Sequence, residues 1–234
     1  YGTDKGYEVA TNMQQVFGGH GYIREWGMEQ FVRDARIAQI YEGTNGIQAL
    51  DLVGRKLGKE GGRAIQSFFR IVGEETAAAK NVEGLKDIAG AVERANNDLQ
   101  TATMWLMQNG MANPNNAGAA AYPYMSLMGT VALGLMWLRM AKVSSEVLAN
   151  GGEDRSFHEA KLITARFFAE RVIPESNAFR RKIEAGVITI NDGDMNMNAP
   201  FGGLKDSSTQ TSKEQAGDSM MSFYTVDKTV YLSA

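Results

Sequence analysis

The most restrictive feature of this sequence is the run from residue 117 to residue 138, which contains no charged side chain. A run of this length can cross a bilayer as one helix, or it can form a helix that is buried on most sides within a bundle. Pro123, three glycines and two hydroxyl residues dilute its apolar character. We therefore expect a helix that is buried on most sides within a bundle, and no membrane span.

Apolar residues recur at helical spacing along most of the chain. Ile47, Leu50, Val53 and Leu57, for example, lie three or four positions apart, which places them on one face of a helix. Glycine, asparagine and proline clusters separate such segments. Helices are expected at residues 4 to 17, 29 to 40, 45 to 57, 63 to 80, 82 to 108, 124 to 149 and 156 to about 186. We expect the last helix to open with a capping box of Ser156 and Glu159 and to be bent or interrupted at Pro174.

The character of the sequence changes at Gly186. The next four residues are strand-like, residues 191 to 203 read as loop, and residues 222 to 232 contain a second strand-like run. The predicted fold is therefore mainly α, a helical bundle with a short β-containing C-terminal tail. We expect three parts, residues 1–58, 59–186 and 187–234.

Charge and cysteine content exclude several classes of function. The formal net charge of -3 provides no positive field for nucleic acid or anionic lipid, so neither is expected as a partner. The absence of cysteine removes thiolate metal sites and cysteine nucleophiles, and it suits a reducing compartment such as the cytoplasm. No metal site is expected. The first residues carry no initiator methionine and no targeting signal, as expected for a chain that begins within a longer protein.

Two sequence blocks carry the strongest functional signal. They are QVFGGHGY at positions 15 to 22 and RDARIAQIYEGTN at positions 33 to 45. The glycines of the first block alone are weak grounds, because they lack the spacing of a dinucleotide-binding turn. Taken together, the two blocks resemble the C-terminal domain of acyl-CoA dehydrogenases. The resemblance is specific as far as residue 57 and continues less specifically to about residue 186, as the additional helical domain of a subgroup that includes methylmercaptopropionyl-CoA dehydrogenases.

This resemblance implies an oxidoreductase of fatty acid metabolism that removes hydrogens from the α and β carbons of an acyl-CoA, with hydride passing to FAD. The catalytic base would be Glu42, Tyr41 would flank the thioester, and Gly43 would leave room for the substrate. The residues implied to contact FAD are Gln15, Phe17, Gly18 and Gly19 on the adenine side of a cofactor held mainly by a neighbouring subunit, and Thr44, Asn45 and Gly46 near the flavin. The implied partners are an acyl-CoA substrate, an electron-transfer flavoprotein and further copies of the chain in a dimer or tetramer.

The role implied for Glu42 is chemically reasonable. Removing an α-proton from a thioester requires a carboxylate held against an apolar, dehydrated substrate. Dehydration raises the pKa of a glutamate from about 4.3 toward neutrality, where it becomes an effective base. The structural alternative is a solvated carboxylate near the start of the third helix, favoured there by the helix dipole. Similarly, Gly18 and Gly19 can form a plain interhelical turn, and the charges between Arg33 and Arg36 can form a salt-bridged face.

The last residues show a second resemblance. The sequences IN at position 190, PFGGLKDSS at 200, KEQ at 213 and YTVDKTVY at 224 are similar to the C-terminal end of aldehyde dehydrogenases. The nucleophile of aldehyde dehydrogenases is a cysteine, and this chain has none. Aldehyde oxidation by this chain alone is therefore excluded. The two resemblances meet near Gly186. A natural fusion, a recombinant fragment and an assembly artefact are three open explanations of this join. The alternative functions are therefore a non-enzymatic helical interaction module or a chimeric fragment with an aldehyde dehydrogenase tail.

Overall fold

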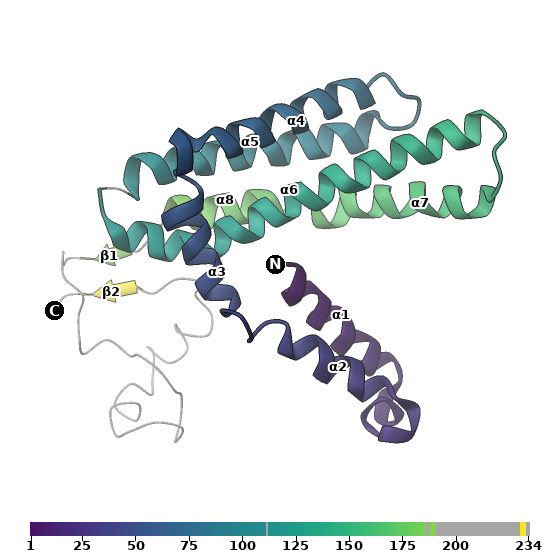
Figure 1. The fold of residues 1–234 in the computed structure, drawn as a ribbon, viewed down its shortest axis with the longest axis horizontal. Coiled ribbons are helices and arrows are strands. Elements are labelled where there is room, and N and C mark those ends of the chain that lie inside the picture. Colours follow the sequence, from purple (N-terminus) through teal and green to yellow (C-terminus); the bar gives the residue numbers. More distant parts are fainter. Residues whose placement is uncertain (111, 186–187, 191–229, 233–234) are drawn as a thin grey trace.

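The computed structural model describes residues 1–110, 112–185, 188–190 and 230–232. These residues form eight α-helices, several short helical turns and two short strands (Figure 1). The helices are α1 Gly2–Val16, α2 Met28–Ile37, α3 Asn45–Asp51, α4 Arg63–Ala79, α5 Lys86–Asn109, α6 Pro114–Ala149, α7 Arg155–Phe167 and α8 Glu175–Ala185. The fold is mainly helical, as the sequence predicts.

Helix α6 runs through the centre of the bundle and contacts α3, α4, α5, α7 and α8. By length and hydropathy α6 would suffice to cross a membrane, but half of its most apolar window is buried inside the bundle. Helices that are apolar on all sides are typical of such a central position. The uncharged run of the sequence therefore has the place predicted for it.

The start of α6 differs from the sequence prediction. The helix begins at Pro114, ten residues before the predicted start at residue 124. Asn113 is the N-cap, and its side-chain oxygen accepts a hydrogen bond from the backbone N–H of Asn115 at 3.0 Å. Proline is well suited to the first helical position because its missing N–H would have no partner there. The segment that reads as a loop is therefore a capped helix start.

The start of α7 also differs from the prediction. Asp154 is its N-cap, in a left-handed conformation and without a side-chain capping bond. Glu159 pairs with Arg155 at 2.9 Å, so the predicted capping box is wrong. The predicted interruption near Pro174 is confirmed, because a π-helical turn at Phe168–Val172 separates α7 from α8.

The apolar core lies between α4, α5, α6 and α8. Its largest fully buried aliphatic side chains are Val72, Leu85, Val92, Leu99, Leu127, Val131, Leu138 and Ile183. Tyr124 is also fully buried, and its hydroxyl lies 2.8 Å from the Thr103 hydroxyl. Burial raises the pKa of Tyr124 to about 12. The Arg180 guanidinium donates to Asp98 at 3.0 Å and thereby joins α8 to α5.

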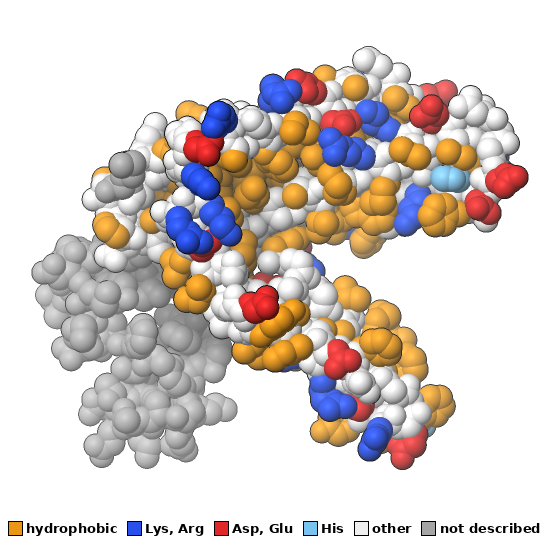
Figure 2. Space-filling view, viewed as in Figure 1, with side chains coloured by type: hydrophobic (Ala, Val, Ile, Leu, Met, Phe, Trp, Pro, Cys, Tyr) orange, Lys and Arg blue, Asp and Glu red, His pale blue; other side chains and the backbone are white. Residues whose placement is uncertain are grey.

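Helices α1 and α2 form a hairpin that extends away from the bundle, and we call residues 2–37 the arm (Figure 1). Gly21 is the one buried residue of the arm. Many of its apolar side chains face solvent, and Figure 2 shows hydrophobic side chains gathered along it. The most exposed of these are Tyr22 at 82%, Val16 at 75% and Phe31 at 66%. The arm therefore has little core of its own.

The two described strands lie in the predicted C-terminal tail. Strand β1, Ile188–Ile190, pairs in parallel with β2, Val230–Leu232, with Ile188 opposite Val230. The rest of the predicted aldehyde dehydrogenase-like tail lies outside the described residues, and that resemblance stays a prediction.

Candidate functional site

The loop between α2 and α3 carries Tyr41, Glu42 and Gly43. Glu42 has a φ of 54°, in the left-handed region that is uncommon for a residue with a side chain. Such a conformation persists where the surrounding structure holds it, and it often occurs at functional sites. The Glu42 side chain is exposed in this structure. The loop therefore presents the predicted base on the surface in an unusual backbone conformation.

Contacts with Gln48 explain why glycine occupies position 43. Gly43 has a φ of 91°, and a Cβ added there would lie 3.0 Å from Nε2 of Gln48. The same Nε2 donates a hydrogen bond to the backbone oxygen of Glu42 at 3.1 Å. The first part of α3 therefore holds the backbone directly after the predicted base.

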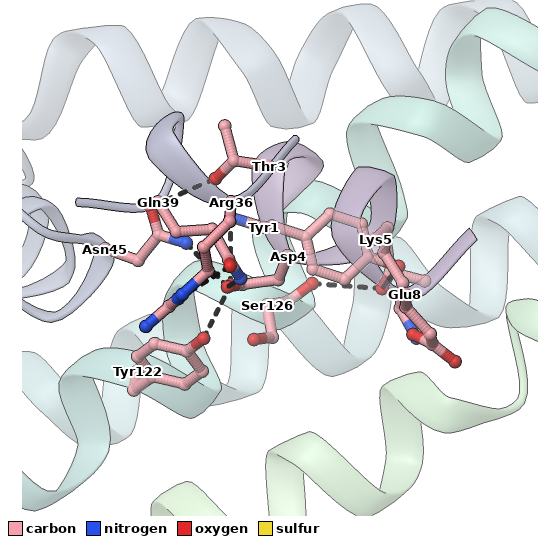
Figure 3. A network of polar contacts seen from close by, with 11 residues as sticks. Tyr1, Thr3, Asp4, Lys5, Glu8, Arg36, Gln39, Asn45, Tyr122 and Ser126 are labelled. Atoms are coloured by element: carbon pink, nitrogen blue, oxygen red, sulfur yellow. Dashed lines mark hydrogen bonds and ion pairs between the residues drawn. The ribbon is translucent and has the colours of Figure 1, made fainter. Parts of the chain in front are cut away.

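A carboxylate on α1 collects the polar contacts of this loop (Figure 3). Oδ1 of Asp4 accepts hydrogen bonds from Nε2 of Gln39 at 2.7 Å and from Nδ2 of Asn45 at 2.6 Å. Its Oδ2 accepts a hydrogen bond from the Tyr122 hydroxyl on α6 at 2.5 Å. We call Asp4, Gln39, Asn45 and Tyr122 the Asp4 cluster. Through this cluster, α1, α6 and both ends of the loop converge on one side chain.

The two amide side chains of the cluster have further partners. Oε1 of Gln39 accepts from Arg36 at 2.7 Å, and Oδ1 of Asn45 accepts from the Thr3 hydroxyl at 3.0 Å. The backbone N–H of Asn45 donates to the backbone oxygen of Gln39 at 3.4 Å and closes the base of the loop. Both the side chain and the backbone N–H of Asn45 are thus engaged within the protein.

Hydrogen bonding in the cluster lowers the pKa of Asp4. Partial burial alone would raise this pKa, but the bonds from Tyr122, Gln39 and Asn45, together with the N-terminal ammonium 3.7 Å from Oδ2, outweigh it and bring the pKa below 3.8. Burial first, and then the bond to Asp4, raises the pKa of Tyr122 to about 12. The cluster therefore holds a carboxylate and a protonated phenol at neutral pH.

We expect Asp4→Asn to lower the pKa of Tyr122 from about 12 while leaving it above 10, because burial remains when the carboxylate is lost. A phenol whose pKa is raised on folding stabilises the native state below pH 10. This stabilisation is lost as pH rises through about 12, and the variant should lose it at lower pH. The change is measured by titrating phenolate absorbance against pH in the parent and in Asp4→Asn. The same titration with Tyr122→Phe added to each protein gives the signal of the other tyrosines, which is subtracted. An unchanged midpoint would contradict it.

The residues predicted to contact FAD fall into two separate groups. Gln15, Phe17, Gly18 and Gly19 lie at the far end of α1, whereas Thr44, Asn45 and Gly46 lie near its first turn. The length of α1 separates the groups by about 20 Å at a rise of 1.5 Å per residue. Asn45 is half-buried and the other six residues are exposed. The structure therefore does not bring the two groups into one pocket within this chain.

The glycine turn at the end of α1 has a structural reason of its own. A Cβ at Gly21 would overlap the backbone oxygen of Gln14, so only glycine allows this close approach of the turn to α1. Gly18 has a left-handed φ of 60°, and a Cβ at Gly18 or Gly19 would meet open space. The turn alternative thus accounts for Gly18 through its left-handed backbone, and the turn also explains Gly21. Gly18 and Gly19 have open space beside them.

The start of α3 lies directly after the loop that carries Glu42. Thr44 is the N-cap without a side-chain capping bond, and Gly46 is exposed in the first turn. Helix starts present backbone N–H groups that suit carbonyl or phosphate oxygens. Among the described residues no group of three or more histidine or acidic side chains is placed to hold a metal ion. The candidate site is therefore the loop that carries Glu42 together with the start of α3.

Sequence reasoning missed Asp4, Gln39 and Tyr122. Asp4 reads as an ordinary acidic residue in a first helical turn, and Tyr122 lies 118 residues away from it in the sequence. No local pattern indicates their contact. The motifs indicate Glu42 and Asn45 as candidate site residues, but they do not indicate Asp4 and Tyr122.

Comparison with known proteins gives matches over both helical parts. Residues 64–193 match the family described as acetyl-CoA dehydrogenase C-terminal like, and residues 1–57 match the acyl-CoA dehydrogenase C-terminal domain. A 3-methylmercaptopropionyl-CoA dehydrogenase of Ruegeria pomeroyi is 37% identical over 77% of this chain and 31% of its own length. The broad-specificity linear acyl-CoA dehydrogenase FadE5 of Mycobacterium tuberculosis is 29% identical over 78% of this chain and 31% of its own length.

A butyryl-CoA dehydrogenase of Syntrophomonas wolfei is 27% identical over 74% of this chain and 29% of its own length. The chain thus spans about a third of the length of these relatives. The family match at residues 64–193 alone covers more than half of the chain. This chain therefore belongs to the acyl-CoA dehydrogenase family and carries helical domains of its C-terminal part.

Proposed function

We propose that this chain contributes the catalytic base of an FAD-dependent acyl-CoA dehydrogenase, and that Glu42 removes the α-proton of the acyl thioester. The observation that carries this proposal is the left-handed backbone of Glu42 in a loop held at both ends by one carboxylate. Strained conformations of this kind are retained at sites that must orient a reacting group. The family membership supports the same chemistry.

In the proposed reaction, the α-carbon loses its proton to the Glu42 carboxylate while the β-carbon loses a hydride, and a double bond forms between them. FAD, when bound, would supply the acceptor of that hydride. Tyr41 would flank the thioester, and Gly43 lets the acyl group approach the backbone closely. Because Glu42 is exposed in this chain, substrate and the surrounding protein of a complete site would have to exclude water from it.

The remaining assignments belong to the same proposal. Thr44, Asn45 and Gly46 would approach the flavin. Gln15, Phe17, Gly18 and Gly19 would contact the adenine side of a cofactor held by another copy of the chain in a dimer or tetramer. An electron-transfer flavoprotein would take the electrons, in the cytoplasm and as part of fatty acid metabolism. The division into residues 1–58, 59–186 and 187–234 is likewise part of the proposal.

A non-enzymatic helical interaction module is the second candidate function. The exposed apolar side chains of the arm favour it, since surfaces of this kind commonly bind other proteins. This candidate predicts a chain that binds no flavin even when it is joined to the rest of a dehydrogenase.

A hybrid enzyme tests the two candidates. Residues 1–185 of this chain would replace the matching C-terminal residues of the Ruegeria pomeroyi relative. We expect the folded hybrid to show flavin absorbance and to oxidise acyl-CoA, whereas the isolated chain should show little or no activity. A folded hybrid that is colourless and inactive would favour the interaction module.

A further inference from the structure

We propose that Asp4 and Tyr122 are positioning residues that fix the orientation of Glu42. Neither residue touches the reacting atoms in this proposal, and both act through the loop that carries the base. The inference rests on the proposed role of Glu42, and it adds the residues on which the efficiency of that base depends.

The contacts around Glu42 are placed symmetrically along the sequence. Gln39 lies three residues before it and Asn45 three residues after it, and both side chains donate to the same oxygen of Asp4. The backbone bond from Asn45 to Gln39 closes the loop between them. Fixing both ends of a short segment leaves few backbone conformations for the residues at its tip. One carboxylate oxygen therefore restrains the backbone of Glu42 from both sides.

Contacts with α6 hold Asp4 in place. The arm has almost no buried side chain, so its own packing cannot fix its first turn. Three contacts join the start of α1 to the central helix α6. Tyr122 donates to Asp4, and the ring of Tyr1 lies where a Cβ on Gly129 would overlap it, at 2.5 Å. The Thr130 hydroxyl also bonds the Tyr1 hydroxyl at 3.1 Å.

Helix α6, in the second helical part of the chain, therefore fixes the position of Asp4 and, through Asp4, the position of the loop that carries Glu42. Tyr122 is the polar link from α6 to Asp4 itself, because its hydroxyl donates to the oxygen of Asp4 that the loop amides do not use. The N-terminal ammonium lies 3.7 Å from the same oxygen. Loss of the Tyr122 bond would let Asp4 and both loop amides shift together. Small misplacements of a catalytic group can reduce turnover by about 10² without abolishing substrate binding.

Matched variants separate positioning from general destabilisation. Asp4→Asn removes the acceptor of the loop amides, and Tyr122→Phe removes the link to α6 while keeping the ring. The controls are Asp34→Asn and Tyr22→Phe, which make the same chemical changes at exposed positions of the arm. Asp4→Glu restores a carboxylate on a longer side chain and should recover part of the effect.

Two measurements report on the inference. In the isolated chain, the backbone order parameters of Glu42 and Gly43 should fall from about 0.85 to below about 0.6 in Asp4→Asn and Tyr122→Phe. Those of Leu99 and Leu127 in the core should not change. In the hybrid enzyme, kcat should fall by about 10- to 100-fold with KM changed by less than about threefold. Both controls should match the parent.

The outcomes distinguish this inference from the proposed function. Unchanged order parameters, or a disordered loop with unchanged kcat, overturn the positioning role. If Glu42→Gln in the hybrid leaves turnover intact, the proposed function fails instead. The order parameters then still show whether the Asp4 cluster holds the loop.

Discussion

Glu42→Gln in the hybrid enzyme is expected to reduce kcat for acyl-CoA oxidation by about 10³-fold. Glutamine has nearly the same size as glutamate, but its amide cannot take up the α-proton. KM should change little, because the proposed substrate contacts of Tyr41 and Gly43 are retained. Reduction of an artificial electron acceptor under saturating acyl-CoA measures the effect.

The control for this substitution is Glu25→Gln, which removes an exposed carboxylate in the turn of the arm. We expect it to leave kcat within about twofold of the parent, because surface charges away from a site act weakly. If Glu42→Gln turns over acyl-CoA as fast as this control, the Glu42 carboxylate is not the base, and the proposed function fails.

Leu127→Ala is expected to lower the free energy of unfolding by about 2–5 kcal/mol. Leu127 is fully buried in the core on α6, and a truncated side chain there loses apolar burial and leaves a cavity. Urea unfolding followed by circular dichroism measures the change in the isolated chain. Because α6 contacts most of the other helices, a loss at this position should affect the bundle as a whole.

Leu133→Ala provides the matched control on the same helix. Leu133 is 39% exposed, and the substitution changes helix propensity by the same amount as at Leu127. We expect a loss of less than about 1 kcal/mol. Equal losses at the two positions would show that α6 is not packed as described.

Much of the helical fold could be predicted from the sequence, because apolar spacing records which face of a helix is buried. The prediction of residues 63 to 80 agrees closely with α4, Arg63–Ala79, whose Ile65, Phe69 and Val72 face the core. The start of α6 does not follow from the sequence pattern, because asparagine and proline, as at Asn113 and Pro114, are also typical of loops. Their capping role depends on the helix that follows them.

The candidate site could be predicted only in part. A local motif indicates Glu42, but the contacts that hold its loop join both ends of the loop to α1 and, through Asp4, to α6. Contacts between such distant positions leave no periodic pattern in a single sequence. The dehydration expected around Glu42 is likewise invisible in this chain, where the side chain faces solvent.

The convergence of three donors on Asp4 has an evolutionary consequence. A change at position 4, 39, 45 or 122 leaves a polar partner without its bond, so its cost depends on the residues at the other three. Substitutions there should be tolerated in combinations and selected against singly. Among relatives with both helical parts, these four positions should consequently change together, even though the first and the last are more than a hundred residues apart.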